Sequence, residues 1–293
     1  MSVLASQYRH PRHPLDPRLL SALCLCVSVV LCTLASAAEL PLPFAPGERL
    51  TYTVRVWLGD NSFGLDVGTA DFTVDKVAAD RAEAYQFEVK AKGGAFGYDV
   101  RSTLTSLIDA ATLKAIRYAE DHRGSDRSQK RLEFSDAKVE YWKWVRIELP
   151  DGTKSDERQW ELQKTVPVDH PCHDLLSALY LARGFDLSNG AKAQAIDVAD
   201  TKKLWRLKAQ GGKPEKLTIP AGTFDAIPVL FTTEPLNEAA RESKFSGLFG
   251  MKGNAQIWVD AAAHRILRIR GALALGVLLN IDVSLKEANS DGK

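Results

Sequence analysis

The feature that most constrains this chain is a two-residue alternation of apolar and other side chains that recurs along most of its length. Near the start of the alternating part, the apolar positions are Leu50, Tyr52, Val54, Val56 and Leu58. Near the end, the same period returns at Val277, Leu279, Ile281, Val283 and Leu285. Successive side chains of a β-strand point to opposite faces, so this period is typical of strands with one buried face. The pattern predicts a mainly β protein.

Further runs of the same kind lie between these two segments. They cover residues 63–77, 84–91, 98–108, 112–122, 127–134, 138–149 and 158–162, and then 194–198, 203–209, 215–219 and 224–233. Turn-forming residues separate several runs, at Gly93-Gly94, Ser135-Asp136 and Pro150-Asp151-Gly152. Gly64 and Gly68 are expected at bulges or bends. Consecutive strands joined by short turns pair antiparallel, so we expect a long antiparallel meander.

One segment interrupts the meander with helical periodicity. In residues 174–183, Leu175, Leu179 and Ala182 share one helix face, and Leu176 and Tyr180 share another. The apolar face of a long meander needs a cover, which closure, sheet packing or a helix can supply. We therefore expect a strongly curved sheet or half-open barrel with one short α-helix in it or across its mouth.

The residues that precede this helix, 169–174, read Asp-His-Pro-Cys-His-Asp and suggest either chemistry or a helix start. A zinc site would need a second pair of ligands, and a Cys172 nucleophile would need a distant base, His122 or His264. Asp174, in contrast, stands where an N-cap belongs. We interpret the cluster as a helix start and expect no catalytic residue, metal or cofactor there.

Residues 1–37 have the three-part form of a secretory signal peptide. Three arginines precede an apolar stretch that ends in Ala35-Ser36-Ala37, a typical cleavage pattern. A retained anchor is the alternative, but the apolar stretch is shorter than the roughly 20 residues of a membrane span. We expect cleavage near Ala37 and one β-rich periplasmic domain, residues 38–293, without a transmembrane segment. Lipidation is not expected, because each leader cysteine follows a leucine.

The charge balance limits the classes of binding partner, and the cysteine content excludes an internal disulfide. The whole chain has 38 basic and 37 acidic residues, and the leader removes three arginines and one aspartate, which leaves a net charge of about −1. This balance argues against nucleic acid or an anionic membrane surface as the main partner. Cys172 is the one cysteine beyond the leader, so the expected domain has no internal disulfide.

Residues 235–254 lack clean alternation and contain four apolar side chains between glycines: Phe245, Leu248, Phe249 and Met251. One interpretation is a flap whose apolar residues bind a ligand. The other is a distorted strand pair that buries them. The aromatic run Tyr141-Trp-Lys-Trp144 is expected to pack across strands, although sugars or single-stranded nucleic acid also stack on such patterns.

Five motifs in order carry a resemblance to a known family. They are FAPGERLTYTV (44–54), IDAATL (108–113) followed by Arg117-Tyr118, DLLSALY (174–180), PAGTF (220–224) and IWVD (257–260). The chain resembles the domain of unknown function family 3108 of bacterial envelope proteins, over about residues 44–286. The resemblance implies a secreted, β-rich envelope domain and implies no catalysis at the helix start.

Two functional classes remain open on this basis. The first is a non-enzymatic periplasmic protein that binds an apolar or amphipathic, lipid-like ligand in the curved sheet, as small barrels can. The second is a structural or assembly factor of the cell envelope that acts through protein contacts. No P-loop, Rossmann glycine pattern, nucleophile elbow or HExxH motif occurs in the sequence, so an enzyme is not expected.

Overall fold

Fifteen strands form one antiparallel sheet in the part of the chain that the computed structural model describes. That part comprises residues 42–58, 64–79, 82–95, 98–125, 127–150, 152–245, 247, 251–273 and 279–289. The strands, all in the unit Pro43–Lys293, are β1 (Arg49–Leu58), β2 (Leu65–Ala79), β3 (Ala82–Ala95), β4 (Tyr98–Asp109), β5 (Ala115–Gly124), β6 (Ser128–Phe134), β7 (Lys138–Glu148), β8 (Lys154–Pro167), β9 (Gln194–Asp200), β10 (Lys203–Gly211), β11 (Glu215–Ile219), β12 (Gly222–Pro235), β13 (Met251–Asp260), β14 (Ile266–Leu273) and β15 (Leu279–Asn289). The expected leader lies outside the described residues.

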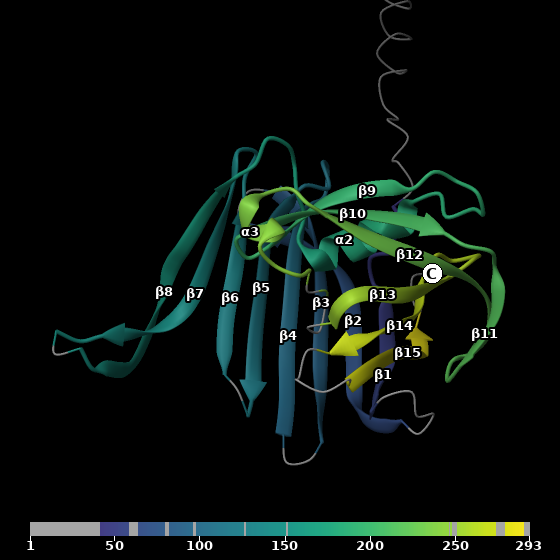
Figure 1. The fold of residues 1–293 in the computed structure, drawn as a ribbon, viewed down its shortest axis with the longest axis horizontal. Helices are drawn as coiled ribbons and strands as arrows, with labels where there is room; N and C mark the ends of the chain where they lie inside the picture. Colours follow the sequence, from purple (N-terminus) through teal and green to yellow (C-terminus); the bar gives the residue numbers. More distant parts are fainter. Residues whose placement is uncertain are drawn as a thin grey trace, which may run out of the picture. The chain divides into compact units, whose positions relative to one another are not determined.

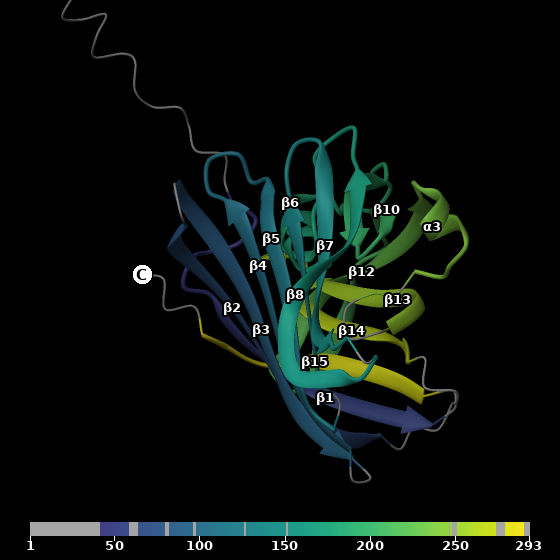
Figure 2. The same ribbon diagram turned by 90° about the vertical axis from the view of Figure 1, so that its left-hand side faces the viewer.

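The sheet is strongly curled but does not close. Its strand order is β8-β7-β6-β5-β4-β3-β2-β1-β15-β14-β13-β12-β10-β9, with β11 paired to β12. The first and last strands are neighbours at its centre, where Val54 lies opposite Val283. The two ends of the sheet, β8 and β9, do not pair with each other, and the views in Figure 1 and Figure 2 show the resulting curl. The predicted curved, half-open antiparallel sheet is confirmed.

Two of the expected turns are present and one is not. Ser135-Asp136 joins β6 to β7, and Gly152, with φ of +79°, turns the chain between β7 and β8. The expected turn at Gly93-Gly94 is wrong, because β3 continues through both glycines to Ala95. A Cβ on Gly93 would lie 2.2 Å from the carbonyl oxygen of Val67, so glycine is required there by the close approach of β2.

The expected irregularity at Gly68 is confirmed as a register shift between β1 and β2. Val54 pairs with Gly68, but the next residue, Arg55, pairs with Asp66, which leaves one extra residue on β2. Gly68 also lies opposite Gly93 across the β2–β3 ladder. Bulges and glycines let strands bend and twist more strongly, so this region accommodates the curl of the sheet.

Helix α2 (Leu175–Leu181) and the following 3₁₀ turn η1 (Ala182–Gly184) lie inside the curl, beside β4 and β9. Figure 1 shows β9 and β10 crossing the direction of β3 to β6 with α2 next to them. The predicted helix is therefore confirmed. A second helix, α3 (Glu238–Arg241), is a single turn capped by Asn237 and is too short to show periodicity in the sequence. No helix among the described residues is long and apolar enough to cross a membrane.

Candidate ligand-binding site

Asp174 fixes the start of α2 by capping the helix and by binding the sheet. Its carboxylate accepts hydrogen bonds from the backbone amides of Leu176 and Ser177, both at 2.9 Å. It also accepts from the hydroxyls of Ser106 on β4 and Ser177, both at 2.7 Å. Asp174 is fully buried, so the helix start is held against β4 by a satisfied buried carboxylate. The predicted N-cap is confirmed.

The residue before the cap ties the same helix to the opposite side of the curl. His173 donates its backbone amide to the Asp197 carbonyl of β9 at 2.9 Å, and its own carbonyl accepts from Ala199 at 2.8 Å. This single parallel bridge adds one residue to the edge of β9. The start of α2 is therefore attached to two strands that lie far apart in the sheet.

The Cys-His cluster shows the properties of a packed helix start. Burial raises the pKa of the Cys172 thiol to about 12 and lowers the pKa of His173 to about 4. A thiol protonated at neutral pH is a poor nucleophile and a poor metal ligand. The two distant histidines bind elsewhere: His122 contacts Ser102 and Glu120, and His264 contacts the carbonyl of Arg183. Within the described ranges, no three His, Cys, Asp or Glu side chains converge as metal ligands would.

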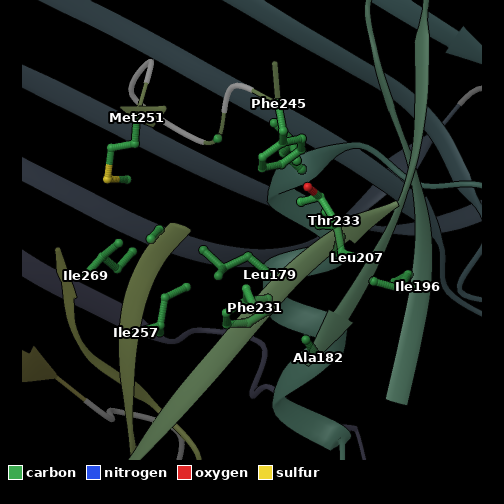
Figure 3. Close-up of a pocket in the computed structure, with 14 residues that line it drawn as sticks. Leu179, Ala182, Ile196, Leu207, Phe231, Thr233, Phe245, Met251, Ile257 and Ile269 are labelled. Atoms are coloured by element: carbon green, nitrogen blue, oxygen red, sulfur yellow. The ribbon is translucent and has the colours of Figure 1, made fainter. Parts of the chain in front are cut away.

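One face of α2 borders an apolar cavity of about 80 Å³. It lies between α2 and the strands β9, β10, β12, β13 and β14, and Figure 3 shows the side chains that surround it. The lining consists of Leu175, Ala178, Leu179, Ala182, Ile196, Leu207, Phe231, Thr233, Phe245, Gly247, Met251, Ala255, Ile257 and Ile269. Thr233 supplies the one side-chain oxygen among them. The cavity thus favours hydrocarbon over polar groups.

Two of the four predicted ligand-binding residues line this cavity. Phe245 packs edge-on against the buried Trp205, with ring centroids 5.5 Å apart, and Met251 begins β13. Leu248 and Phe249 lie outside the described residues. Sequence reasoning missed Ile196 and Leu207, because strand residues that fill a core and strand residues that border a cavity show the same alternation.

A small polar recess of about 10 Å³ adjoins the cavity, and Leu175 lines both. The recess is lined by Tyr118, Glu120, Lys130, Leu132, Leu175, Ala199, Asp200 and Thr201. Its volume suits about one water molecule or one small polar group. The recess lies where β5 and β6 face the turn between β9 and β10.

Glu120 on β5 organises the polar side of this recess. Its carboxylate accepts from the Tyr118 hydroxyl at 2.8 Å, from His122 Nε2 at 2.8 Å and from Lys130 Nζ at 2.9 Å. Burial alone would raise the pKa of Glu120, but His122 and Lys130 outweigh it and lower the pKa to about 2. Glu120 is therefore a satisfied anion at neutral pH.

The same network contains a hydroxyl, an imidazole and a carboxylate in series. Ser102 Oγ lies 2.7 Å from His122 Nδ1, and the other ring nitrogen binds Glu120. Hydrolases activate a serine by this order of groups, but they also need donors for an oxyanion. Ser102 lies inside β4, which is paired on both sides, so the neighbouring backbone amides belong to sheet ladders. We interpret the series as a cross-strand network that holds Glu120.

The aromatic run on β7 packs across strands, as predicted. Trp144 lies opposite Trp160 of β8, and their ring centroids are 5.4 Å apart. The guanidinium of Arg131 lies 5.1 Å from the Trp142 ring centre and 4.5 Å from that of Trp160. These contacts stabilise the β6–β7–β8 part of the sheet.

The protein has an open, curled antiparallel sheet with helix α2 inside the curl and an apolar cavity beside that helix. The family described as "Protein of unknown function (DUF3108)" matches residues 51–282. The chain belongs to this family, as the five sequence motifs indicated.

Among solved structures, the chain is similar to a candidate lipoprotein from Parabacteroides distasonis ATCC 8503. The two chains are 11% identical, the match covers 85% of this chain and 98% of the other, and the TM-score is 0.30. No curated protein matches the chain.

Proposed function

We propose that this is a non-enzymatic envelope protein of the periplasm that binds an apolar or amphipathic ligand inside its curled sheet. The observation that carries the proposal is the apolar cavity between α2 and the strands β9, β10, β12, β13 and β14. The leader-like residues 1–37 support the compartment. Sheets that curl around an internal space serve as carriers for small apolar molecules in other proteins.

The size of the cavity limits what it holds. Sites for drug-sized ligands measure roughly 300–1,000 Å³, and an engineered apolar cavity of about 150 Å³ binds benzene. The present cavity, at about 80 Å³, is smaller than either. It suits the end of an alkyl chain rather than a whole lipid.

Linear alcohols test the proposal directly. Octanol should bind the purified protein in calorimetric titrations and should raise its melting temperature, because a ligand that binds only the folded state stabilises it. Replacing Ala255, a lining residue of β13, with leucine should fill the cavity and abolish binding. Ala262→Leu, on the exposed turn after β13, is the matched control and should bind normally. Equal octanol binding by Ala255→Leu and the wild type would contradict the proposal.

A different observation favours a second function, envelope assembly through protein contacts. Strand β8 forms one end of the sheet and exposes Leu162, whose exposed fraction is 42%. Native mass spectrometry of protein purified from its own envelope separates the two functions. A stoichiometric small adduct would support the carrier, and a copurifying chain in stoichiometric amount would support the assembly factor.

A further inference from the structure

The polar recess and the apolar cavity form two compartments on the same side of α2. Leu175, the first residue of the helix, lines both, so the two compartments meet at this residue. For a ligand with an apolar chain and a compact polar end, the cavity offers a surface to the chain and the recess offers one to the polar end. This inference rests on the proposed function and concerns the chemistry of the polar end.

The recess carries more negative than positive charge. Its lining contains two carboxylates, Glu120 and Asp200, and one ammonium, Lys130. Glu120 already accepts from three donors, Lys130 among them. Lys203 lies near Asp200 but is not part of the lining.

Asp200 differs from Glu120 because no donor from the described part of the chain binds its carboxylate. Among the described residues, no hydrogen bond or ion pair to this side chain is formed, although the residue is only partly exposed. Desolvation raises the pKa of Asp200, and the charges of Lys130 and of Lys203, its cross-strand partner, oppose that rise. A partly buried carboxylate without a donor is stabilised by any ligand that supplies one.

The position of Asp200 is fixed by the turn that carries it. It ends β9 directly before Thr201, which has a φ of +58° and donates its hydroxyl to the Asp200 carbonyl at 2.6 Å. On the other side of the recess, Glu120 and Lys130 are held by the β5–β6 ladder. The backbone on both sides of the recess is therefore held by hydrogen bonds.

We propose that the protein binds an amphiphile with a hydrogen-bond-donating, cationic head group, such as a primary ammonium, with the head at Asp200 and the alkyl chain past Leu175 in the apolar cavity. A carboxylate or phosphate head is disfavoured, because it would approach two carboxylates while the one ammonium in the lining, Lys130, is already bound to Glu120. A hydroxyl head is intermediate, since it donates one neutral hydrogen bond.

Three probes with the same alkyl chain test the head group: octylamine, octanol and octanoate, each titrated calorimetrically below its micelle-forming concentration. Octylamine should bind about tenfold more tightly than octanol, because a hydrogen bond to a charged group contributes roughly that factor. Octanoate should bind most weakly. In Asp200→Asn the preference for octylamine over octanol should disappear, while octanol binding stays within about twofold.

The matched control is Asp225→Asn, which removes an exposed carboxylate of β12 that pairs with Lys216 away from the recess. This variant should keep the preference. If all three probes bind the wild type equally, or if Asp200→Asn keeps the preference, the head-group inference is wrong while the carrier function stands. If none of the probes binds, the proposed function itself fails. Lower salt should strengthen octylamine binding in the wild type but not in Asp200→Asn, which separates the charge at Asp200 from general attraction.

Discussion

The two faces of helix α2 meet different surroundings inside one curled sheet. On one face, Tyr180 stacks on Phe87 of β3 with ring centroids 4.3 Å apart, and Phe44 packs edge-on against both rings. Just beyond, the Arg183 guanidinium binds both carboxylate oxygens of Glu48, at 2.6 and 2.9 Å. This face of the helix is therefore packed by aromatic rings and by the Arg183–Glu48 ion pair.

On the other face, Leu175, Leu179 and Ala182 look onto the cavity. Their partners on β9, β10 and β14 are aliphatic and leave space between them. Residues on opposite faces of α2 therefore border a packed core and a cavity. Both regions form within one sheet, without a second layer. Helix α2 therefore lies between a tightly packed aromatic core and a second core, around Val198 and Trp205, that leaves a cavity.

The largest expected effect compares two leucines of this helix. Leu176→Ala should lower the free energy of unfolding by about 3 to 5 kcal/mol, because Leu176 is fully buried and its loss leaves a cavity. Leu179→Ala, the same change on the cavity face, should cost only about 1 to 2 kcal/mol. Urea melts of both variants measure the difference. Equal losses would mean that both faces belong to one packed core.

A second test asks whether the charge of Glu120, in the polar recess, stabilises the fold. The pKa of Glu120 is about 2 in the folded protein, against an ordinary value near 4.5. The folded state therefore holds the ionised form more strongly, and this stabilisation is present above about pH 4.5 and lost as the pH falls toward 2. Glu120→Gln should lower stability at neutral pH by up to about 3 kcal/mol, with a difference from the wild type that shrinks in acid.

Denaturant melts at a series of pH values check this expectation. The control is Leu132→Val, which removes one methylene group from the lining of the same recess and changes no charge, so its difference from the wild type should not vary with pH. If Glu120→Gln lowers the free energy of unfolding by the same amount at every pH, Glu120 stabilises the protein through packing and not through its charge.

The third test sharpens the role of the helix start. Asp174→Ala should destabilise the protein by about 2 kcal/mol, the upper end for a lost N-cap, because Ser106 also loses its partner. Cys172→Ala, two residues away, should cost about 1 kcal/mol or less and leave cellular function unchanged. Chemical denaturation and a complementation assay measure both. Loss of function in Cys172→Ala with stability intact would reinstate a chemical role for the thiol.

The smallest effect is expected at the cavity wall. Phe245→Ser should cost about 1 to 2 kcal/mol, well below the roughly 3 to 5 kcal/mol of a fully buried phenylalanine, because Phe245 is only partly buried. It should nevertheless weaken octanol binding. A thermal melt and a titration of the same sample decide the point, and a loss as large as that of Leu176→Ala would make Phe245 a core residue.

Much of the fold was readable from local pattern. The alternation located most strands, and the helical period correctly paired Leu176 with Tyr180 and Leu175 with Leu179. The glycine pair at 93–94 misled because glycine serves both turns and close strand contacts. Register across β1 and β15 depends on residues far apart in the sequence, which no local period encodes.

The candidate site was readable only in part. Phe245 and Met251 stood out because they interrupt an alternating chain, and both line the cavity. Asp200 and Glu120 gave no such signal, since each looks like an ordinary polar strand residue. Their proximity arises from the curl, which brings β5 to the β9–β10 turn.

The central pairing of β1 with β15 has a consequence for how the chain is made. The ribosome releases β1 well before β15, so the middle ladder of the sheet cannot form until every other strand of the sheet has emerged. Contacts of such long sequence separation slow folding. Loss of β15 would remove an interior strand and split the sheet, whereas loss of an edge strand would only shorten it. A nascent chain therefore lacks its central ladder until β15 has been made.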